Sequence, residues 1–176
     1  MNATLEELMR LVPPATRPPI GDWDSAEQAL HHHLPTDYKD LVNLYGSGAF
    51  CGYLELLVPP GVWEPYDIVE FNDGHGDYAV DVWREEDEKP HEFSADLGYE
   101  LIAWASTIDG DTLYWLAHTD QKPESWRTLL VSEDLAVWEH YDAPAPAVLL
   151  GLLTGEIDSD IVTPDLSAVT FKPYPA

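Results

Sequence analysis

The chain has 176 residues, of which 45% are hydrophobic and 11% aromatic, a composition that excludes a disordered or fibrous protein and allows one domain with a real core. It holds 33 acidic residues against 8 lysines and arginines, a formal net charge of −25. Phosphate backbones and anionic lipid surfaces are bound through Lys and Arg, so this charge balance argues against binding to nucleic acid and to membrane surfaces. It permits a basic protein partner, which such a field would attract.

The first predicted element is a short helix over residues 4–12. Thr4 and Glu7 have capping-box spacing, and leucines recur on one helical face after them. Two prolines end this helix and open the stiff, proline-rich connector PPATRPPIG at 13–21. The N-terminus has acids where a signal peptide has basic residues, and no apolar run is long enough to span a bilayer, so we expect a cytoplasmic protein.

Two further helices are predicted before residue 46. Asp24, with Glu27 three residues on, marks the start of a helix over about 25–33. A third helix, TDYKDLVNLY, occupies 36–45, with apolar residues on one face. Gly46 then supplies a left-handed stop.

The central part of the chain is predicted to contain one strand and one long helix. Residues 49–58, AFCGYLELLV, have the composition of a strand, which the Pro-Pro-Gly at 59–61 ends. Residues 66–86 have amphipathic helical spacing. The NDGHGD sequence at 72–77 opposes that helix, because each glycine in a helix interior costs about 1 kcal/mol.

The second half of the chain is predicted to form an antiparallel meander. Four short aromatic and β-branched segments are separated by turn sequences, and they cover 101–106, 112–118, 127–133 and 136–141. Asp142 is then expected to cap a helix that ends at Gly155, and one more edge strand is expected at 169–171. Helices, then strands, then a helix predict a single α+β domain.

Several motifs have ordinary structural interpretations. The glycines of YGSGAFCG follow a helix and precede a strand, which is the reverse of a phosphate-binding loop. Three adjacent histidines, His31 to His33, point about 100° apart on a helix and cannot all face one metal ion. Cys51, the single cysteine, excludes an internal disulfide and is expected to be a small buried residue.

No catalytic, metal or cofactor site is predicted. The acidic stretch 72–77 and the Asp109-Gly110-Asp111 turn lack the spacing of an EF-hand, and Asp109-Gly110 is a hairpin signal. There is no Gly-x-Ser-x-Gly elbow, and carboxylate pairs are too abundant to single out an acid and a base. An acidic hydrolase therefore stays only as a third hypothesis.

Acidic residues are concentrated in one part of the chain. Residues 61–100 hold 13 carboxylates and two cations, and Asp73, Asp77, Asp81 and Glu85 recur every four residues. On one helical face, like charges at that spacing cost about 0.2–0.5 kcal/mol per pair. A solvated face and a face for a basic partner are both consistent with this pattern.

Residues 34–50, LPTDYKDLVNLYGSGAF, resemble the SUKH superfamily of the Smi–Knr type. The matching positions are Leu34, Pro35, Asp37, Tyr38, Tyr45, Gly46, Gly48 and Phe50. A later stretch, WASTIDGDTLYWL at 104–116, is similar to the family's Gly-Asp hairpin, with Gly110, Asp111, Tyr114 and Trp115 in place. Ser125-Trp126 and the helix at 148–153 follow in the family's order.

The resemblance covers roughly 22–155 and implies an antiparallel sheet flanked by helices. It divides the chain into a helix and connector at 1–21, a SUKH-like domain at 22–155 and a tail at 156–176. It also implies an immunity protein that neutralises a cognate toxin domain, often a nuclease, by stoichiometric contact. The alternative is a non-enzymatic regulatory interaction module of the cell-wall-regulator type, without a toxin partner. Neither role is enzymatic, so the resemblance implies a protein that is not an enzyme.

The partner is expected to bind the acidic segment from 64 to 81. That segment combines a dense field of one sign with a glycine-containing loop, whereas the strands are needed for the core. The candidate partner-binding residues are Glu64, Asp67, Glu70, Asp73, Asp77 and Asp81. If they do not bind it, the 109–111 turn and the 156–165 tail are the alternatives.

Overall fold

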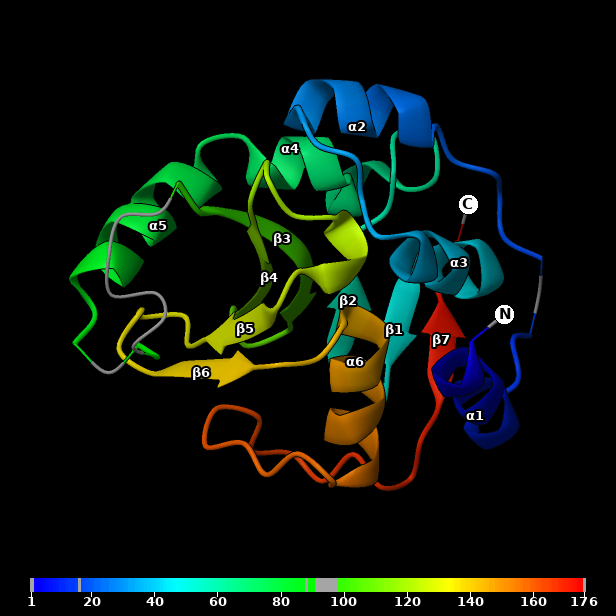
Figure 1. Cartoon of the computed structure of the whole chain (residues 1–176). Helices are drawn as coiled ribbons and strands as arrows, with labels where there is room; N and C mark the ends of the chain where they lie inside the picture. Colours follow the sequence, from blue (N-terminus) through cyan, green and yellow to red (C-terminus); the bar gives the residue numbers. More distant parts are fainter. Residues whose placement is uncertain (1, 16, 88, 91–97, 176) are drawn as a thin grey trace.

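The protein is described by a computed structural model covering residues 2–15, 17–87, 89–90 and 98–175. Its centre is a seven-stranded antiparallel sheet in the order β6-β5-β4-β3-β2-β1-β7 (Figure 1). The strands are β1 Gly48–Phe50, β2 Leu54–Leu56, β3 Glu100–Thr107, β4 Thr112–Ala117, β5 Thr128–Val131, β6 Trp138–Tyr141 and β7 Phe171–Pro173. The predicted α+β fold with an antiparallel sheet is confirmed.

Helices pack around this sheet in two groups. In one group, α6 contacts both α1 and α3; in the other, α4 contacts α2 and α5, and both α4 and α5 contact β3 (Figure 1). The helices are α1 Ala3–Leu11, α2 Trp23–Leu30, α3 Thr36–Tyr45, α4 Ile68–Asn72, α5 His75–Glu85 and α6 Ala145–Thr154, with 3₁₀ turns η1 Glu64–Tyr66 and η3 Pro123–Ser125. Within the described residues, no helix is both long and apolar enough to cross a bilayer.

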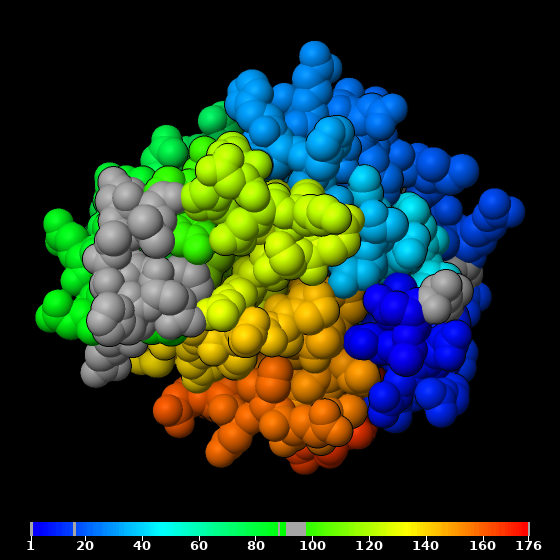
Figure 2. Space-filling model, viewed as in Figure 1, coloured from blue at the N-terminus to red at the C-terminus, as the bar shows by residue number. Residues whose placement is uncertain are grey.

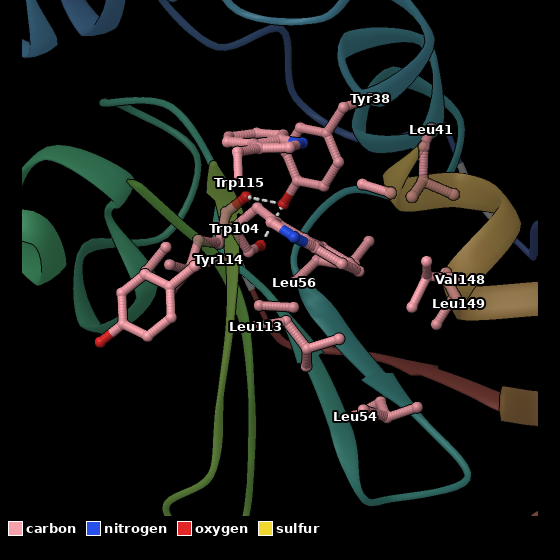
Figure 3. Close-up of a cluster of buried hydrophobic side chains, with 14 of the residues drawn as sticks. Tyr38, Leu41, Leu54, Leu56, Trp104, Leu113, Tyr114, Trp115, Val148 and Leu149 are labelled. Carbon is pink, nitrogen blue, oxygen red and sulfur yellow. Dashed lines mark hydrogen bonds between the residues drawn. The ribbon is translucent and has the colours of Figure 1, made fainter. Parts of the chain in front are cut away.

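Tyr38 joins α3 to the middle of the sheet (Figure 3). Its ring meets Trp104 and Trp115 edge-on, at centroid distances of 5.8 and 4.9 Å. Its hydroxyl lies 2.7 Å from the Leu57 carbonyl and also within hydrogen-bonding distance of the Trp104 carbonyl. Burial raises the pKa of Tyr38 well above its ordinary value, so the hydroxyl remains a donor.

The N-terminal helices form where expected, but two begin earlier. Asn2, rather than the Thr4 box, caps α1 by accepting from Leu5 N at 2.9 Å. Asp22, rather than Asp24, caps α2 by accepting from Ser25 N at 3.0 Å. In both cases a suitable cap lay two residues upstream of the predicted one. Helix α3 has the predicted bounds.

The predicted strand at 49–58 is wrong, because a tight hairpin divides it. Cys51 and Gly52 both have positive φ, 54° and 62°, as a type I′ turn requires. Tyr53 N donates to the Phe50 carbonyl at 2.9 Å across this turn. Both flanking strands are fully buried, so the apolar run continued through the turn and concealed it.

The meander predicted for the second half is confirmed as β3 to β6. The register of β3 against β4 shifts between Ala103 and Ala105, which marks a bulge.

The expected Asp142 cap of α6 is wrong: Pro144 occupies the N-cap position, and no described side chain caps the helix. Gly155 ends α6 in the left-handed conformation, with φ 77°.

Both ends of the chain pack onto the central domain. Leu5 and Leu8 of α1 are fully buried, and α1 contacts α6. Tyr45 of α3 donates its hydroxyl hydrogen bond to the Val12 carbonyl at 2.7 Å. Strand β7 pairs with β1 at one edge of the sheet, so the expected C-terminal edge strand exists two residues later than predicted. The division at 21 and 155 stays a prediction.

Candidate partner-binding surface

The six predicted partner-binding carboxylates lie on three consecutive short elements. Five are exposed and Asp67 is half-buried. We call them the acidic surface: Glu64 on η1, Asp67 and Glu70 at the start of α4, Asp73 after α4, and Asp77 and Asp81 on α5.

The continuous helix predicted over 66–86 is wrong. Asp67 starts α4 by accepting from Val69 N at 2.8 Å and Glu70 N at 3.3 Å. The helix ends at Asn72, and Gly74, with φ 78°, begins α5 in a new direction. Asp73 therefore lies outside α5, and the expected row of four stacked carboxylates is reduced to Asp77, Asp81 and Glu85. This break relieves part of the like-charge repulsion.

Two residues of the interrupting sequence hold these helices on the sheet. The Asn72 amide accepts from Ala103 N at 2.8 Å and donates to the Ala103 carbonyl at 3.0 Å. A Cβ on Gly76 would lie 2.8 Å from the Leu101 carbonyl, so only glycine lets α5 approach β3 this closely. The NDGHGD segment at 72–77, which opposed one continuous helix, therefore docks α4 and α5 on the sheet. Ala79 and Trp83 complete the buried face of α5.

Most carboxylates of the acidic surface have no partner among the residues that the structure describes. Glu64, Glu70, Asp73 and Asp77 make no side-chain hydrogen bond or ion pair within the described ranges. Asp81 Oδ1 lies 3.5 Å from Arg84 Nη1, and both side chains are exposed. Such an ion pair stabilises the fold by at most about 1 kcal/mol. Apart from the Asp67 cap, these charges contribute little to the fold and are available to a partner.

A polar hollow of about 550 Å³ lies beside α5, between the end of α2 and the start of β3. Asp77, Asp81, Arg84 and Glu100 contribute the charged groups of its lining. His32 positions the Glu100 side chain in this lining, because its Nε2 lies 2.9 Å from a Glu100 carboxylate oxygen. Three carboxylates around one concave space suit a Lys or Arg side chain of a partner.

Tyr78 is a feature of this surface that the sequence analysis missed. It is 68% exposed on α5, between Asp77 and the buried Ala79. Exposed tyrosines surrounded by charge are frequent anchors of protein interfaces. Its position just before Ala79 on the amphipathic pattern could have identified it. In Figure 2 the α5 region, in green, lies at the left edge of the molecule.

The other motifs have structural roles. His33 Nδ1 and the Lys39 ammonium both contact the Glu27 carboxylate, at 2.9 and 2.6 Å. Asp111, in the Gly-Asp hairpin, is buried. Cys51 is half-buried rather than fully buried, with Sγ 3.4 Å from the Leu166 carbonyl. No group of three or more His, Cys, Asp or Glu among the described residues is arranged to hold a metal ion.

Comparison with known families assigns the fold. Residues 20–136, more than half of the chain, match the family model SUKH_6, described as SMI1-KNR4 cell-wall. The chain belongs to the SMI1-KNR4 family. The match spans α2 to the loop before β6, so it includes the whole acidic surface of this SUKH domain. Neither the curated proteins nor the solved structures give a match.

Proposed function

We propose that this SUKH domain is an immunity protein that binds a basic toxin domain, of the nuclease type, and neutralises it by stoichiometric contact in the cytoplasm. It acts without catalysis or cofactor. The observation that carries the proposal is the acidic surface. Its carboxylates have few partners within the described part of the chain, and they lie on helices that Asn72 and Gly76 dock onto the sheet. Family membership supports it.

The proposed inhibition is occlusion of a basic substrate site. A nuclease needs cationic surface to hold phosphates, and an acidic face of similar extent competes for the same groups. Long-range attraction between a chain of charge −25 and a basic toxin raises the association rate. The hollow beside α5 then receives a Lys or Arg, and Tyr78 supplies apolar contact area.

Co-expression tests this function directly. The toxin domain is the C-terminal domain of a secreted protein encoded beside this chain, and it is expressed with and without the chain. We expect growth to be restored by the chain and a one-to-one complex to be recovered. Toxicity that is undiminished although the chain is expressed and folded would overturn the proposal.

A regulatory module of the cell-wall-regulator type is the second candidate, because the matched family is described as SMI1-KNR4 cell-wall. In that case the acidic surface binds a basic partner that is harmless when expressed alone. Growth of cells that express only the partner therefore separates the two functions.

A further inference from the structure

A groove of about 730 Å³ lies between the proline connector and the C-terminal segment of the chain. Four stretches distant in sequence line it: 17–20, 45–47, 62–63 and 173–175. Its side chains are mostly prolines and large apolar or aromatic groups. None of the six residues of the acidic surface lines it.

The connector is fixed against the domain on both sides of the groove. Gly46 has φ 72°, and a Cβ there would lie 2.5 Å from Cβ of Pro18, so the connector can cross the end of α3 only over a glycine. A Cβ on Gly21 would lie 2.2 Å from Cγ of Pro59. Asp22 N donates to the Pro60 carbonyl at 3.1 Å. The groove is therefore built into the fold and needs little ordering to accept a ligand.

Stacked aromatic rings form its other wall. The Tyr174 ring lies 5.4 Å from Tyr66 at 14° and 6.2 Å from Trp63 at 26°. The hydroxyls of Tyr66 and Tyr174 both donate to the buried Glu55 carboxylate. Burial, followed by the hydrogen bond to Glu55, raises the pKa of Tyr66 to about 12, and the pKa of Tyr174 rises for the same reasons. Both hydroxyls therefore stay protonated and hold the rings in place.

The polar side chains of the groove that lack partners within the described residues can all donate hydrogen bonds. Within the described part of the chain, the Trp63 indole N–H and the Arg17 guanidinium make no hydrogen bond or ion pair. Ser47, which is 7% exposed, has a buried hydroxyl with no partner there either. The Tyr45 hydroxyl is already bonded to Val12, and the lining prolines have no N–H. A matching ligand is apolar and offers carbonyl acceptors to these side-chain donors.

We propose that this groove binds an extended, proline-rich segment of a basic partner protein. Such a segment adopts the polyproline II conformation, exposes its carbonyls and has few N–H groups to satisfy. Its rings would pack on Trp63 and Tyr174, as in other aromatic-lined grooves that bind such segments. The net charge of −25 attracts basic flanking residues and repels a free apolar carboxylate, the other ligand that Arg17 could pair with. This site is independent of the proposed immunity function.

Fluorescence anisotropy with the full chain tests the proposal. The probe is a labelled peptide of two arginines followed by three Pro-Leu-Pro repeats, compared with a peptide in which alanine replaces every proline. We expect only the proline peptide to bind. Trp63→Ala should weaken binding about tenfold or more, and Trp63→Phe, which keeps a ring but removes the N–H, should weaken it less. Arg17→Gln should weaken it a few-fold, and Ile108→Ala, an exposed residue outside the groove, should not.

Three results would overturn the proposal. Equal binding of the alanine peptide shows attraction by charge alone. Proline-peptide binding that Trp63→Ala does not change, in a variant with an unaltered circular dichroism spectrum, places the peptide elsewhere. Binding of phenylacetate that depends on Trp63, with no binding of either peptide, makes the groove a site for small apolar acids.

Discussion

Two sets of carboxylates in this protein occupy opposite environments. Asp111 and Glu27 are surrounded by donors: Asp111 accepts from the Thr107 hydroxyl at 2.8 Å and from Glu133 N at 3.1 Å, and Glu27 accepts from Lys39 and from Leu34 N. The carboxylates of the acidic surface are exposed, except for the half-buried Asp67, and apart from Asp67 and Asp81 they are unpartnered in the described structure. Charge that stabilises the fold is thus separated from charge that is free for a partner.

This separation predicts different results for the same chemical change. Removing a carboxylate from the first set leaves buried or half-buried donors without an acceptor, which lowers the free energy of unfolding. Removing carboxylates from the acidic surface takes away repulsion and little else. The predictions below run from the largest expected loss of stability to none.

Asp111→Ala should cause the largest loss of stability. It removes the acceptor that joins the β3–β4 turn to the loop after β5, and it leaves the Glu133 N–H and the Thr107 hydroxyl unpaired. We expect the free energy of unfolding to fall by about 2–4 kcal/mol. Urea unfolding measures this, with Asp111→Asn, which keeps one acceptor oxygen, as the milder control. A loss no larger than that of an exposed Asp109→Ala variant would contradict the account.

Glu27→Gln should cause a smaller, pH-dependent loss. Burial opposes ionisation, but hydrogen bonds from Lys39, Leu34 N and His33 outweigh it and lower the pKa of Glu27. A group whose pKa is lowered on folding stabilises the protein above its unfolded pKa, and this is lost as the pH falls through the folded pKa. We expect the free energy of unfolding of the wild type to exceed that of the variant by about 1–2 kcal/mol near neutral pH. This difference should disappear on acidification below about pH 4. Parallel urea titrations check this; a gap that widens in acid would refute it.

The triple variant Asp73→Asn, Asp77→Asn, Asp81→Asn should keep its stability. We expect a change within about 0.5 kcal/mol, or a slight gain, because repulsion along α5 falls and only the exposed Arg84 contact is lost. Urea unfolding and circular dichroism measure it. A loss above about 2 kcal/mol would show that these charges belong to the structural set.

The sequence predicted those elements that carry local signals. Helix α3 and its Gly46 stop were predicted with the correct bounds, because the apolar face, the preceding proline and the glycine lie next to one another. The meander was predicted because turn residues separate its strands. The Cys51-Gly52 hairpin was missed because both of its strands are buried on both faces and show no alternation.

The acidic surface could be predicted only as a set of charges. The break between α4 and α5 depends on the bonds of Asn72 to Ala103, 31 residues away, and on the approach of Gly76 to β3. The hollow exists because α5 lies beside Glu100, which no local pattern in the sequence indicates. The spacing of the acidic residues predicted their density correctly, but it placed them on one continuous helix where the structure has two.

The association rate with the proposed toxin partner tests the central claim most directly. Stopped-flow measurement at low and high salt compares three chains: wild type, the triple variant above, and a control variant. The control removes three exposed carboxylates that have no partner among the described residues, Glu7→Gln, Asp40→Asn and Glu156→Gln. We predict a wild-type rate that falls steeply with salt, a much lower rate for the acidic-surface variant, and a control close to wild type. Equal slowing by both variants, or a rate that does not change with salt, would contradict the claim that these carboxylates steer the partner to this face.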